Sequence, residues 1–392
     1  MNHFYRTGGP TAPPSPPSRW SYSTLKEWRR CPRQWWLKRA DYVGLSERYP
    51  QPIHPTAIEG RLIHDALEAF ANHAATESAE GTAFEEIRRA FAVRSYMKRR
   101  LREILSEDVE PNPRVEKTDL LARISIDSCV DGFRRGVKAL GSMPFQSREP
   151  RVKSDSVIAD PSPYDGPERT ITIDDPPITG RFDWSRYGVI CDFKTGDPDP
   201  THAEQLRLYA VLVWAAFGVQ PGGLEIHYVR TDERVRVEVP SVSELSALQE
   251  ELRREITSAN ETIRAGSAPP NPSEEHCRWC PVRQFCDAFW NDSVTSSLRW
   301  PRPEEEVDDG AAPEVLFADV RLTDFRSETS GDGYHGFASA GGKTPAVSIP
   351  AAWTPGAGIR PGTLQLLGAR VESQSDQTVV SVARHTEVFW SS

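Results

Sequence analysis

Four cysteines of the chain occur at spacings that suit a metal centre. Cys277, Cys280 and Cys286 form a C-x2-C-x5-C run, and Cys31 lies far upstream in the segment WRRCPRQWW. Cysteine thiolates bind soft metals, and a four-coordinate site needs one ligand more than the local run supplies. Cys31 is the obvious source of that ligand. A centre built from all four would join the two ends of a long segment of chain.

The residue types alone leave the nature of that centre open. Iron–sulfur clusters and zinc ions both accept thiolates, although structural zinc sites usually take their ligands from two local pairs. A disulfide within the run is a further alternative, but six cysteines in 392 residues are not the dense framework of a small secreted domain. His276 is either an accidental neighbour of the run or a substitute ligand. Cys129 and Cys191 lack partners at ligand spacing, so we expect them to pack as small buried groups.

A second set of residues could bind a harder cation. Asp183 ends one expected strand, in GRFDW, and Asp192 and Lys194 lie on the next, in CDFKTG. Residues two apart in a strand point to the same face, so Asp192 and Lys194 project together and Asp183 can join them. Two carboxylates can hold a divalent cation that activates water, and a lysine can orient that water or stabilise charge on a phosphate. The alternative is a salt bridge at the surface end of a strand.

Two flanking helices carry further polar side chains. Gln205 and Tyr209 are four residues apart on the helix expected after the second strand, and therefore share one of its faces. Upstream, GRLIH places His64 on an amphipathic helix. A lone helical histidine is more often structural than catalytic, so these residues gain significance from the acidic motifs between them.

In this order the motifs resemble those of the PD-(D/E)XK nucleases of the RecB type. Their pattern is a helix histidine, an aspartate after G-x-x, a D-x-K strand and a Q-x3-Y helix. The chain has His64, GRFD with Asp183, DFK with Asp192 and Lys194, and QLRLY with Gln205 and Tyr209. The resemblance implies an α/β fold with a restriction-endonuclease-like core, in which helices flank a mixed central sheet, and a helical N-terminal part.

The same resemblance implies roles for these residues. Asp183 and Asp192 would bind Mg²⁺ or Mn²⁺, and His64 would assist that metal site. Lys194 would position the attacking water. The remaining pair, Gln205 and Tyr209, would shape the site or contact the DNA backbone.

The cysteines narrow the resemblance to one subgroup. Helicase–nuclease subunits and CRISPR-adaptation nucleases of this type carry a [4Fe–4S] cluster on one upstream cysteine followed by proline and then a C-x2-C-x5-C run. Here the ligands would be Cys31, which precedes Pro32, with Cys277, Cys280 and Cys286. The resemblance therefore implies an iron–sulfur cluster, with zinc as the rival, and it covers roughly residues 20–290.

Periodicity and turn residues predict the order of elements. We expect residues 1–19, rich in proline and serine, to be disordered, residues 20–291 to form the nuclease domain, and residues 292–313 to be an acidic linker. Helices are expected over 21–39, 57–76, 83–105, 117–140, 202–217 and 241–265. Strands are expected over 151–159, 169–174, 178–184, 188–193, 224–230 and 234–239.

Residues 314–392 are expected to form a separate small β domain. Short strands are expected over 315–325, 333–339, 345–349, 363–371 and 377–384, which suits an OB-like barrel. Such barrels bind single strands by stacking bases on aromatic side chains in a basic groove. The candidates here are Phe325, Tyr334, Phe337 and Trp353, with Arg326 and Lys343 for phosphates. Alternatively, the aromatic residues form the core of the barrel, or the domain docks a protein.

Composition limits the class of protein. Charged residues make up 26% and hydrophobic residues 38%, which is typical of a soluble globular protein. The net charge of −9 argues against a general polyanion binder. No apolar run reaches membrane-spanning length and the N-terminal segment has no hydrophobic signal core, so we expect a cytoplasmic protein without a membrane partner.

Taken together, the sequence predicts a divalent-metal-dependent DNA nuclease with a structural iron–sulfur cluster. We expect an exonuclease that acts on DNA ends or single strands, in DNA repair, recombination or antiphage defence. A helicase or a defence-system protein is the expected partner. The alternative is a non-catalytic nucleic-acid-binding module, or a zinc-stabilised interaction module, on a nuclease-like scaffold.

Overall fold

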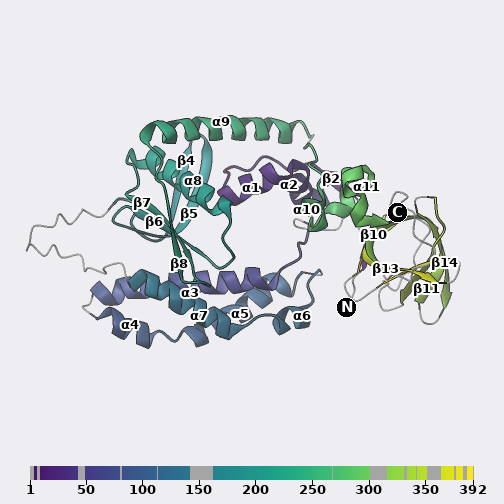
Figure 1. Cartoon of the computed structure of the whole chain (residues 1–392), viewed down its shortest axis with the longest axis horizontal. Helices are drawn as coiled ribbons and strands as arrows, with labels where there is room; N and C mark the ends of the chain where they lie inside the picture. The colour runs from purple at the N-terminus through teal and green to yellow at the C-terminus, as the bar shows by residue number, and fades with distance from the viewer. Residues whose placement is uncertain are drawn as a thin grey trace, which may run out of the picture.

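The structure is a computed structural model, shown in Figure 1. It describes residues 4–6, 9–42, 49–79, 82–112, 114–141, 162–266, 268–300, 316–330, 333–340, 342–350, 363–374, 377–382 and 386–391. The strand expected over 151–159 lies outside these residues. Within them, none of the helices combines the length and the apolar character needed to span a membrane.

A five-stranded mixed sheet forms the centre of the larger part of the molecule. Its strands stand in the order β4 (Gly166–Asp174), β5 (Pro177–Arg186), β6 (Val189–Lys194), β7 (Gly223–Tyr228) and β8 (Glu233–Val237). Neighbouring strands are antiparallel except β6 and β7, which are parallel because helix α8 (Pro200–Phe217) returns the chain between them. The prediction of a mixed central sheet is confirmed.

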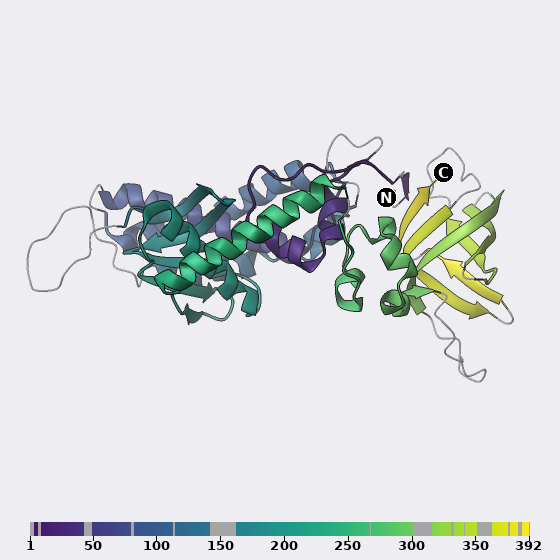
Figure 2. The ribbon, with the colours of Figure 1, turned by 90° about the horizontal axis from the view of Figure 1, so that it is seen from above.

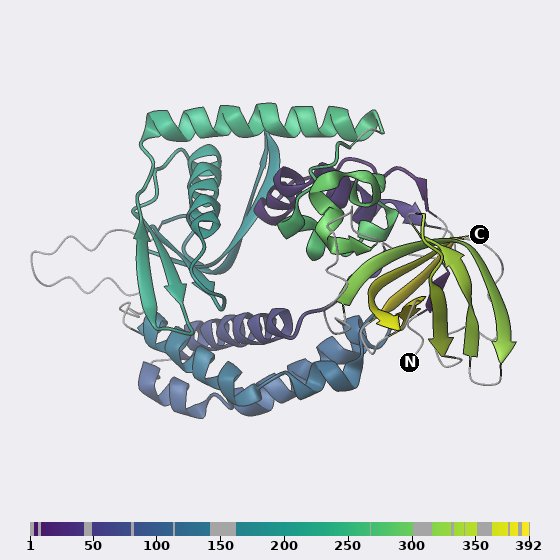
Figure 3. The same ribbon diagram turned by 45° about the vertical axis from the view of Figure 1, so that its right-hand side comes forward.

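Helices cover both faces of this sheet (Figure 1, Figure 3). One layer contains α8, α9 (Val242–Arg264), α1 (Tyr22–Arg30) and α2 (Pro32–Arg39). The other contains α3 (Pro55–Ala79), α4 (Phe84–Ala90), α5 (Val93–Ile104), α6 (Lys117–Ala122) and α7 (Ile126–Gly141). Each layer has its own hydrophobic core against the sheet.

Strand β6 shows how the sheet separates these two cores. Ile190 packs into the core beneath α8, whereas Cys191 and Phe193 pack into the core beneath α3. Because side chains alternate along a strand, Asp192 and Lys194 lie on the same side as Ile190, toward α8. The strand therefore aims its charged pair at one helix and buries its apolar pair against another.

The helix expected over 21–39 is two helices. Cys31 separates α1 from α2 with extended backbone angles (φ −162°, ψ 105°). The following Pro32 disfavours a helical conformation in the residue before it, and it then begins α2 as its first residue. The helices expected over 83–105 and 117–140 are likewise divided, into α4 with α5 and into α6 with α7. A π-helix, Leu105–Val109, follows α5 directly.

The N-terminal segment differs from the disordered tail that we expected. Strand β2 (Pro10–Ala12) pairs with β3 (Asp41–Tyr42), and β1 (Phe4–Arg6) pairs with β15 near the other end of the chain. Trp20 then joins β5, where its backbone exchanges hydrogen bonds with Pro177 and Thr179. Proline and serine content indicated disorder here, but the described residues 4–6 and 10–12 pair with distant strands.

A closed five-stranded barrel forms the C-terminal part, and Figure 2 shows it at one end of the molecule. Around the barrel the strands are β10 (Leu316–Ser330), β11 (Gly333–Ser339), β12 (Ala346–Pro350), β14 (Gln377–Ser381) and β13 (Thr363–Gln374), which pairs back with β10. Only β12 and β14 are parallel within this ring. Aliphatic side chains such as Val320, Ile349 and Leu366 fill its interior.

Two details of this region differ from the expectation. The strand expected over 377–384 stops at Ser381, and a further strand, β15 (Glu387–Ser391), pairs with β13. The expected linker begins as a 3₁₀ helix, Ser293–Leu298, followed by the short strand β9 (Arg299–Trp300), which pairs with β10. The rest of that linker, 301–313, lies outside the described residues.

Candidate active site

The two aspartates of the acidic motifs lie where strands β5 and β6 separate. The β5–β6 pairing runs from Arg186 and Val189 to Trp184 and Cys191. Asp183 and Asp192 are the next residues on the two strands, beyond the last pair. There the Asp183 carboxylate accepts a hydrogen bond from the backbone N–H of Phe193 at 2.6 Å. A side chain thus replaces a backbone partner, and two carboxylates meet at the fork.

Asp192 and Lys194 project together from β6. Lys194 Nζ lies 2.5 Å from Asp192 Oδ2, and the Asp192 side chain is almost fully buried. Burial and the nearby Asp183 carboxylate raise the pKa of Asp192 to about 6, against the opposing effect of Lys194. Oδ2 is buried, and the Lys194 ammonium group is its charge partner.

Helix α8 holds Lys194 from the other side. Lys194 donates a hydrogen bond to Gln205 Oε1 at 2.8 Å, and Gln205 donates to the Tyr209 hydroxyl at 2.6 Å. That hydroxyl in turn donates to the backbone carbonyl of Arg181 at 2.6 Å. Gly180 permits the close approach, because a Cβ there would lie 2.9 Å from Tyr209 Cε1 and 2.5 Å from Leu212 Cδ1. The chain of hydrogen bonds fixes the ammonium group relative to β5.

Helix α3 contributes His64 from the opposite layer. His64 Nδ1 lies 3.3 Å from Asp183 Oδ1. Burial disfavours the imidazolium, but the Asp183 carboxylate outweighs burial and raises the pKa of His64 to about 9. Burial likewise acts against the Asp183 anion, but His64 and the Phe193 amide hold the pKa of Asp183 below its ordinary value. The two groups form an ion pair at neutral pH.

Three charged residues that the sequence analysis did not identify complete this cluster. Ligand atoms of His64, Glu168 and Asp183 all lie within 4.8 Å of one another. Arg181 forms ion pairs with Glu168 and with Glu68 of α3, the latter at 2.9 Å. Burial and the Asp183 charge raise the pKa of Glu168 to about 7. Glu168 also has a positive φ of 45°, which is uncommon outside glycine.

The register of the β4–β5 hairpin explains the position of Glu168. Arg169 pairs with Phe182 and Pro167 with Trp184, so Glu168 and Asp183 occupy facing positions between these pairs. Asp183 therefore has one acidic residue across from it on β4 and another, Asp192, on β6. Counting residues back from the hairpin turn would have found Glu168, whereas no motif contains it.

The four cysteines of the expected metal centre also come together. Cys31, Cys277, Cys280 and Cys286 line one hollow between α2 and the C-terminal cysteine loop, which we define as residues 277–286. One backbone hydrogen bond from Arg33 to Pro269, and a side-chain bond from Asn271 to the carbonyl of Arg30, join the α1–α2 region to the segment that precedes this loop. All four thiols are free of disulfide bonds. His276 is not among the residues that line the hollow.

The cysteine loop also contacts the barrel. Arg283, between Cys280 and Cys286, forms a 2.5 Å ion pair with Asp319 of β10. Arg114 is buried and donates to both carboxylate oxygens of Glu387 on β15 at 2.8 Å, and to the carbonyl of Pro281 at 2.6 Å. Tyr42, Phe285 and Phe389 form adjacent ring contacts in the same region. The barrel thus packs directly on the loop that carries three of the four thiols.

The candidate nucleic-acid residues of the barrel are only partly described. Phe337 of β11 has 53% of its surface exposed, and Lys343 is exposed in the turn between β11 and β12. Arg326 of β10 faces Phe337 in the backbone register, and Tyr334 faces Thr329. Phe325 lies at the register shift of β10 between Thr323 and Arg326. Trp353 lies outside the described residues.

The larger part of the molecule, which contains the mixed sheet, matches a known protein family. The family model of the PD-(D/E)XK nuclease superfamily matches residues 19–287. That stretch contains the mixed sheet, the acidic cluster and all four cysteines of the hollow. The chain belongs to the PD-(D/E)XK nuclease superfamily.

Other comparisons add little to this assignment. No curated protein matches the chain. Among solved structures, the tetrameric p202 HIN2 is 10% identical with a TM-score of 0.18, and covers 21% of this chain and 43% of its own. The p204 HINb domain has 12% identity and a TM-score of 0.18 over 21% and 42% of the two chains. The chain thus spans less than half the length of these structures, and likenesses this weak carry no argument.

Proposed function

We propose that the chain is a divalent-metal-dependent deoxyribonuclease whose active site is the acidic cluster at the fork of β5 and β6. The observation that carries this proposal is the meeting of Asp183 and Asp192 with Lys194 at one point of the sheet. A scaffold without catalysis has no need for two carboxylates that burial and mutual repulsion make costly. Membership of a nuclease superfamily supports the same conclusion.

The donor set fits Mg²⁺ or Mn²⁺. Asp183, Asp192 and His64 would hold the cation, because carboxylate oxygens suit hard cations and the two aspartates meet where β5 and β6 separate. Glu168 is close enough to act as a further ligand or to hold a proton. When bound, the cation supplies positive charge to the scissile phosphate and lowers the pKa of water near it.

The chain's own side chains orient the remaining reactants. Lys194 places its ammonium group between Asp192 and Gln205, where it can position the attacking water and stabilise charge that develops on the phosphate. Gln205 and Tyr209 keep that ammonium group in place. His64 carries a proton while the cation is absent and must release it to act as a ligand.

We propose further that a [4Fe–4S] cluster occupies the hollow of the four cysteines. Four free thiols line one hollow, which supports a metal centre over a disulfide. The arrangement of one upstream cysteine and three clustered ones favours the cluster over zinc, because structural zinc sites usually take their ligands from two local pairs.

The substrate we propose is DNA with free ends or single strands, cut as an exonuclease would cut it. The order of the barrel strands, with β12 parallel to β14, supports an OB-like domain that binds single strands through exposed residues such as Phe337 and Lys343. This activity would serve DNA repair, recombination or antiphage defence. Its partner would be a helicase or a defence-system protein.

A nuclease assay tests the proposal. End-labelled linear DNA and closed circular DNA, each single- and double-stranded, would be incubated with and without Mg²⁺ or Mn²⁺. We expect degradation of linear substrates only, and complete loss with EDTA, with Asp192→Ala and with Lys194→Ala. Lys138→Ala removes a lysine on the exposed surface of α7 and should cut normally. Normal cutting by both active-site variants would remove the nuclease assignment from this cluster.

The competing function is a non-catalytic nucleic-acid-binding module, or a zinc-stabilised interaction module. The first predicts binding of labelled DNA without cleavage under every metal condition. The second predicts a colourless protein with zinc and no iron after anaerobic purification, whereas an iron–sulfur protein is brown.

A further inference from the structure

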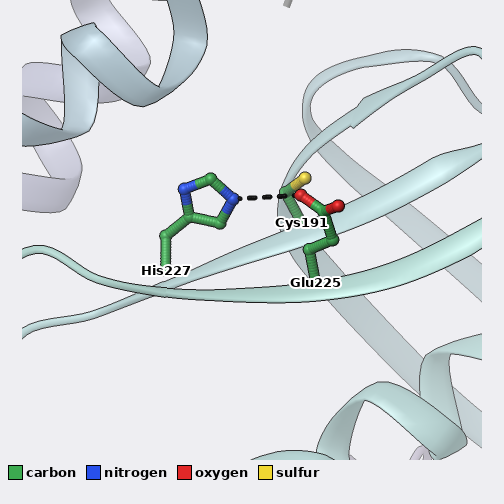
Figure 4. Close-up of side chains that lie close together, drawn as sticks. All are labelled: Cys191, Glu225 and His227. Carbon is green, nitrogen blue, oxygen red and sulfur yellow. Dashed lines mark hydrogen bonds and ion pairs between the residues drawn. The ribbon is translucent and has the colours of Figure 1, made fainter. Parts of the chain in front are cut away.

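A second group of ligand atoms lies on the face of the sheet opposite Asp192. Cys191 of β6 faces Glu225 of β7 in the parallel register, and His227 follows Glu225 by two residues on the same face. The sulfur, a carboxylate oxygen and an imidazole nitrogen all lie within 4.8 Å of one another. Figure 4 shows the imidazole directed at the Glu225 carboxylate, with the thiol beside it.

Cys191 and His227 are deeply buried, and Glu225 is partly buried. Cys191 has none of its surface exposed and His227 only 2%, beneath the helices of the α3 layer. His227 Nε2 lies 3.3 Å from one oxygen of Glu225, and the other oxygen accepts from Arg236 at 3.3 Å. The structure gives no hydrogen-bond partner for the sulfur of Cys191 within its described part. A sulfur, a nitrogen and an oxygen thus converge on one point inside an otherwise apolar core.

We infer that Cys191, Glu225 and His227 bind a zinc ion. Thiolate, imidazole and carboxylate are the three ligand types of protein zinc sites, and three protein ligands leave a fourth position for water. A thiolate selects against Mg²⁺ and Mn²⁺, which prefer oxygen. The site is therefore chemically distinct from the acidic cluster, although Cys191 is next to Asp192 in the chain.

The surrounding charges allow a divalent cation. The thiolate and the carboxylate together balance the charge of Zn²⁺. Arg236 donates a hydrogen bond to the second oxygen of Glu225. The Arg236 side chain is 89% exposed, so solvent screens its positive charge. Arg234 faces His227 in the register and donates weakly to the carbonyl of Ala139. Arg236 thus contacts only the Glu225 oxygen that does not face His227, and the hydrogen bond given for Arg234 goes to a backbone carbonyl.

A zinc ion here would tie β6 to β7 beside the catalytic residues. Asp192 and Lys194 alternate with Cys191 and Phe193 on β6, so a bond to Cys191 limits the movement of that strand. Backbone hydrogen bonds already pair β6 with β7, and the ion would add a side-chain link between the same two strands. The inference holds whether or not the acidic cluster cleaves DNA, because the ligands are separate.

Cobalt binding tests the site on the full-length protein. Co²⁺ replaces Zn²⁺ and gives a charge-transfer band in the near ultraviolet when a thiolate is a ligand. We expect the metal-depleted protein to bind about one equivalent of Co²⁺ at this site with that band, and excess Mg²⁺ not to displace it. The same band should persist in Cys31→Ser, which alters only the four-cysteine hollow. Difference spectra before and after Co²⁺ addition remove the absorption of any iron–sulfur cluster.

Variants of the ligands decide the outcome. Cys191→Ser should abolish the band, and Glu225→Gln and His227→Asn should weaken Co²⁺ binding at least about tenfold. Cys129→Ser removes a buried thiol outside the site, and should change neither the charge-transfer band nor the Co²⁺ affinity. If Cys191→Ser does not fold, Glu225→Gln decides the outcome. The Glu225 carboxylate is partly exposed and the glutamine amide has the same shape, so we expect this variant to fold. Wild-type Co²⁺ binding by Glu225→Gln, or a Co²⁺ band that is absent from Cys31→Ser, would overturn the inference.

Discussion

Asp183 accepts a hydrogen bond from the backbone N–H of Phe193, across the gap where β5 leaves β6. The carboxylate takes the place of a strand partner and is thereby held in one orientation. Glu168 and Asp192 occupy the facing positions on the two neighbouring strands. Three acidic residues thus lie in a row across the sheet, and the structure keeps the central one ionised.

The first prediction concerns Glu168, which no sequence motif marks. Glu168→Gln should weaken Mg²⁺ binding about tenfold, because it removes an acidic group within ligand distance of His64 and Asp183. Isothermal titration calorimetry measures the affinity, and the matched control is Glu250→Gln on the surface of α9. Unchanged affinity in Glu168→Gln would limit this residue to its ion pair with Arg181.

The second prediction concerns pH. His64 has a pKa of about 9 in the cation-free protein, against an ordinary value of 6.5, so it is protonated at pH 7. A proton and a metal compete for the imidazole, and Mg²⁺ affinity should therefore rise between pH 7 and pH 9 by up to about tenfold per unit. Titrations at several pH values measure this slope, and His64→Gln should flatten it.

The raised pKa of His64 also makes the stability of the cation-free protein depend on pH. That stability falls as pH rises, whereas the Mg²⁺ affinity rises. The stability from the His64–Asp183 pair is fully present below pH 6.5 and is lost as pH rises through about 9. Urea unfolding in EDTA at pH 6 and pH 9 should show this loss in the wild type and a smaller loss in His64→Gln. Equal losses in both proteins would contradict the assigned pair.

The third prediction concerns the hydrogen-bonded chain behind Lys194. Tyr209→Phe leaves the Gln205 amide and the carbonyl of Arg181 without their partner, which should cost about 1–3 kcal/mol of unfolding free energy. It should also lower kcat more than it raises KM, because Lys194 loses its fixed position. Urea unfolding and cleavage kinetics give both quantities. Tyr187→Phe, at a partly exposed turn, should change neither.

The fourth prediction concerns the cysteine hollow. Cys31→Ser should remove the iron and lower the Tm of the whole PD-(D/E)XK region, because the hollow joins segments far apart in the sequence. Iron and sulfide analysis of anaerobically purified protein should find about four of each in the wild type. Cys129→Ser should retain both. Zinc in place of iron, bound by the wild type and lost in Cys31→Ser, would replace the cluster by the rival centre.

The fifth prediction concerns the contact between Arg114 and the barrel. Arg114→Met should destabilise the protein by about 3–5 kcal/mol, because it leaves the Glu387 carboxylate without its buried partner. Adding Glu387→Gln should recover part of that loss, and a double-mutant cycle by urea unfolding measures the coupling. Arg99→Met, on an exposed face of α5, serves as the control. Additive effects would show that the pair contributes no coupling.

The sequence predicted most residues of the acidic cluster, because they lie in short motifs whose spacing sets the direction of each side chain. The D-x-K spacing alone placed Asp192 and Lys194 on one face, and the order of the motifs indicated the rest. Glu168 could not be found this way, since its position depends on the register of a hairpin. The break at Cys31 followed from Pro32, but helical periodicity on either side concealed it. Strand β15 was missed because it is short and pairs only with distant residues.

The contact between Arg283 and Asp319 gives the cysteine loop a mechanical role. One side of this short loop faces the four-thiol hollow, and the other side bears the barrel. A group bound by these thiols, as proposed above, would therefore be separated from the barrel only by this loop. A substitution in the cysteine loop would therefore be expected to affect both the hollow and the contact with the barrel, because the same short segment forms both.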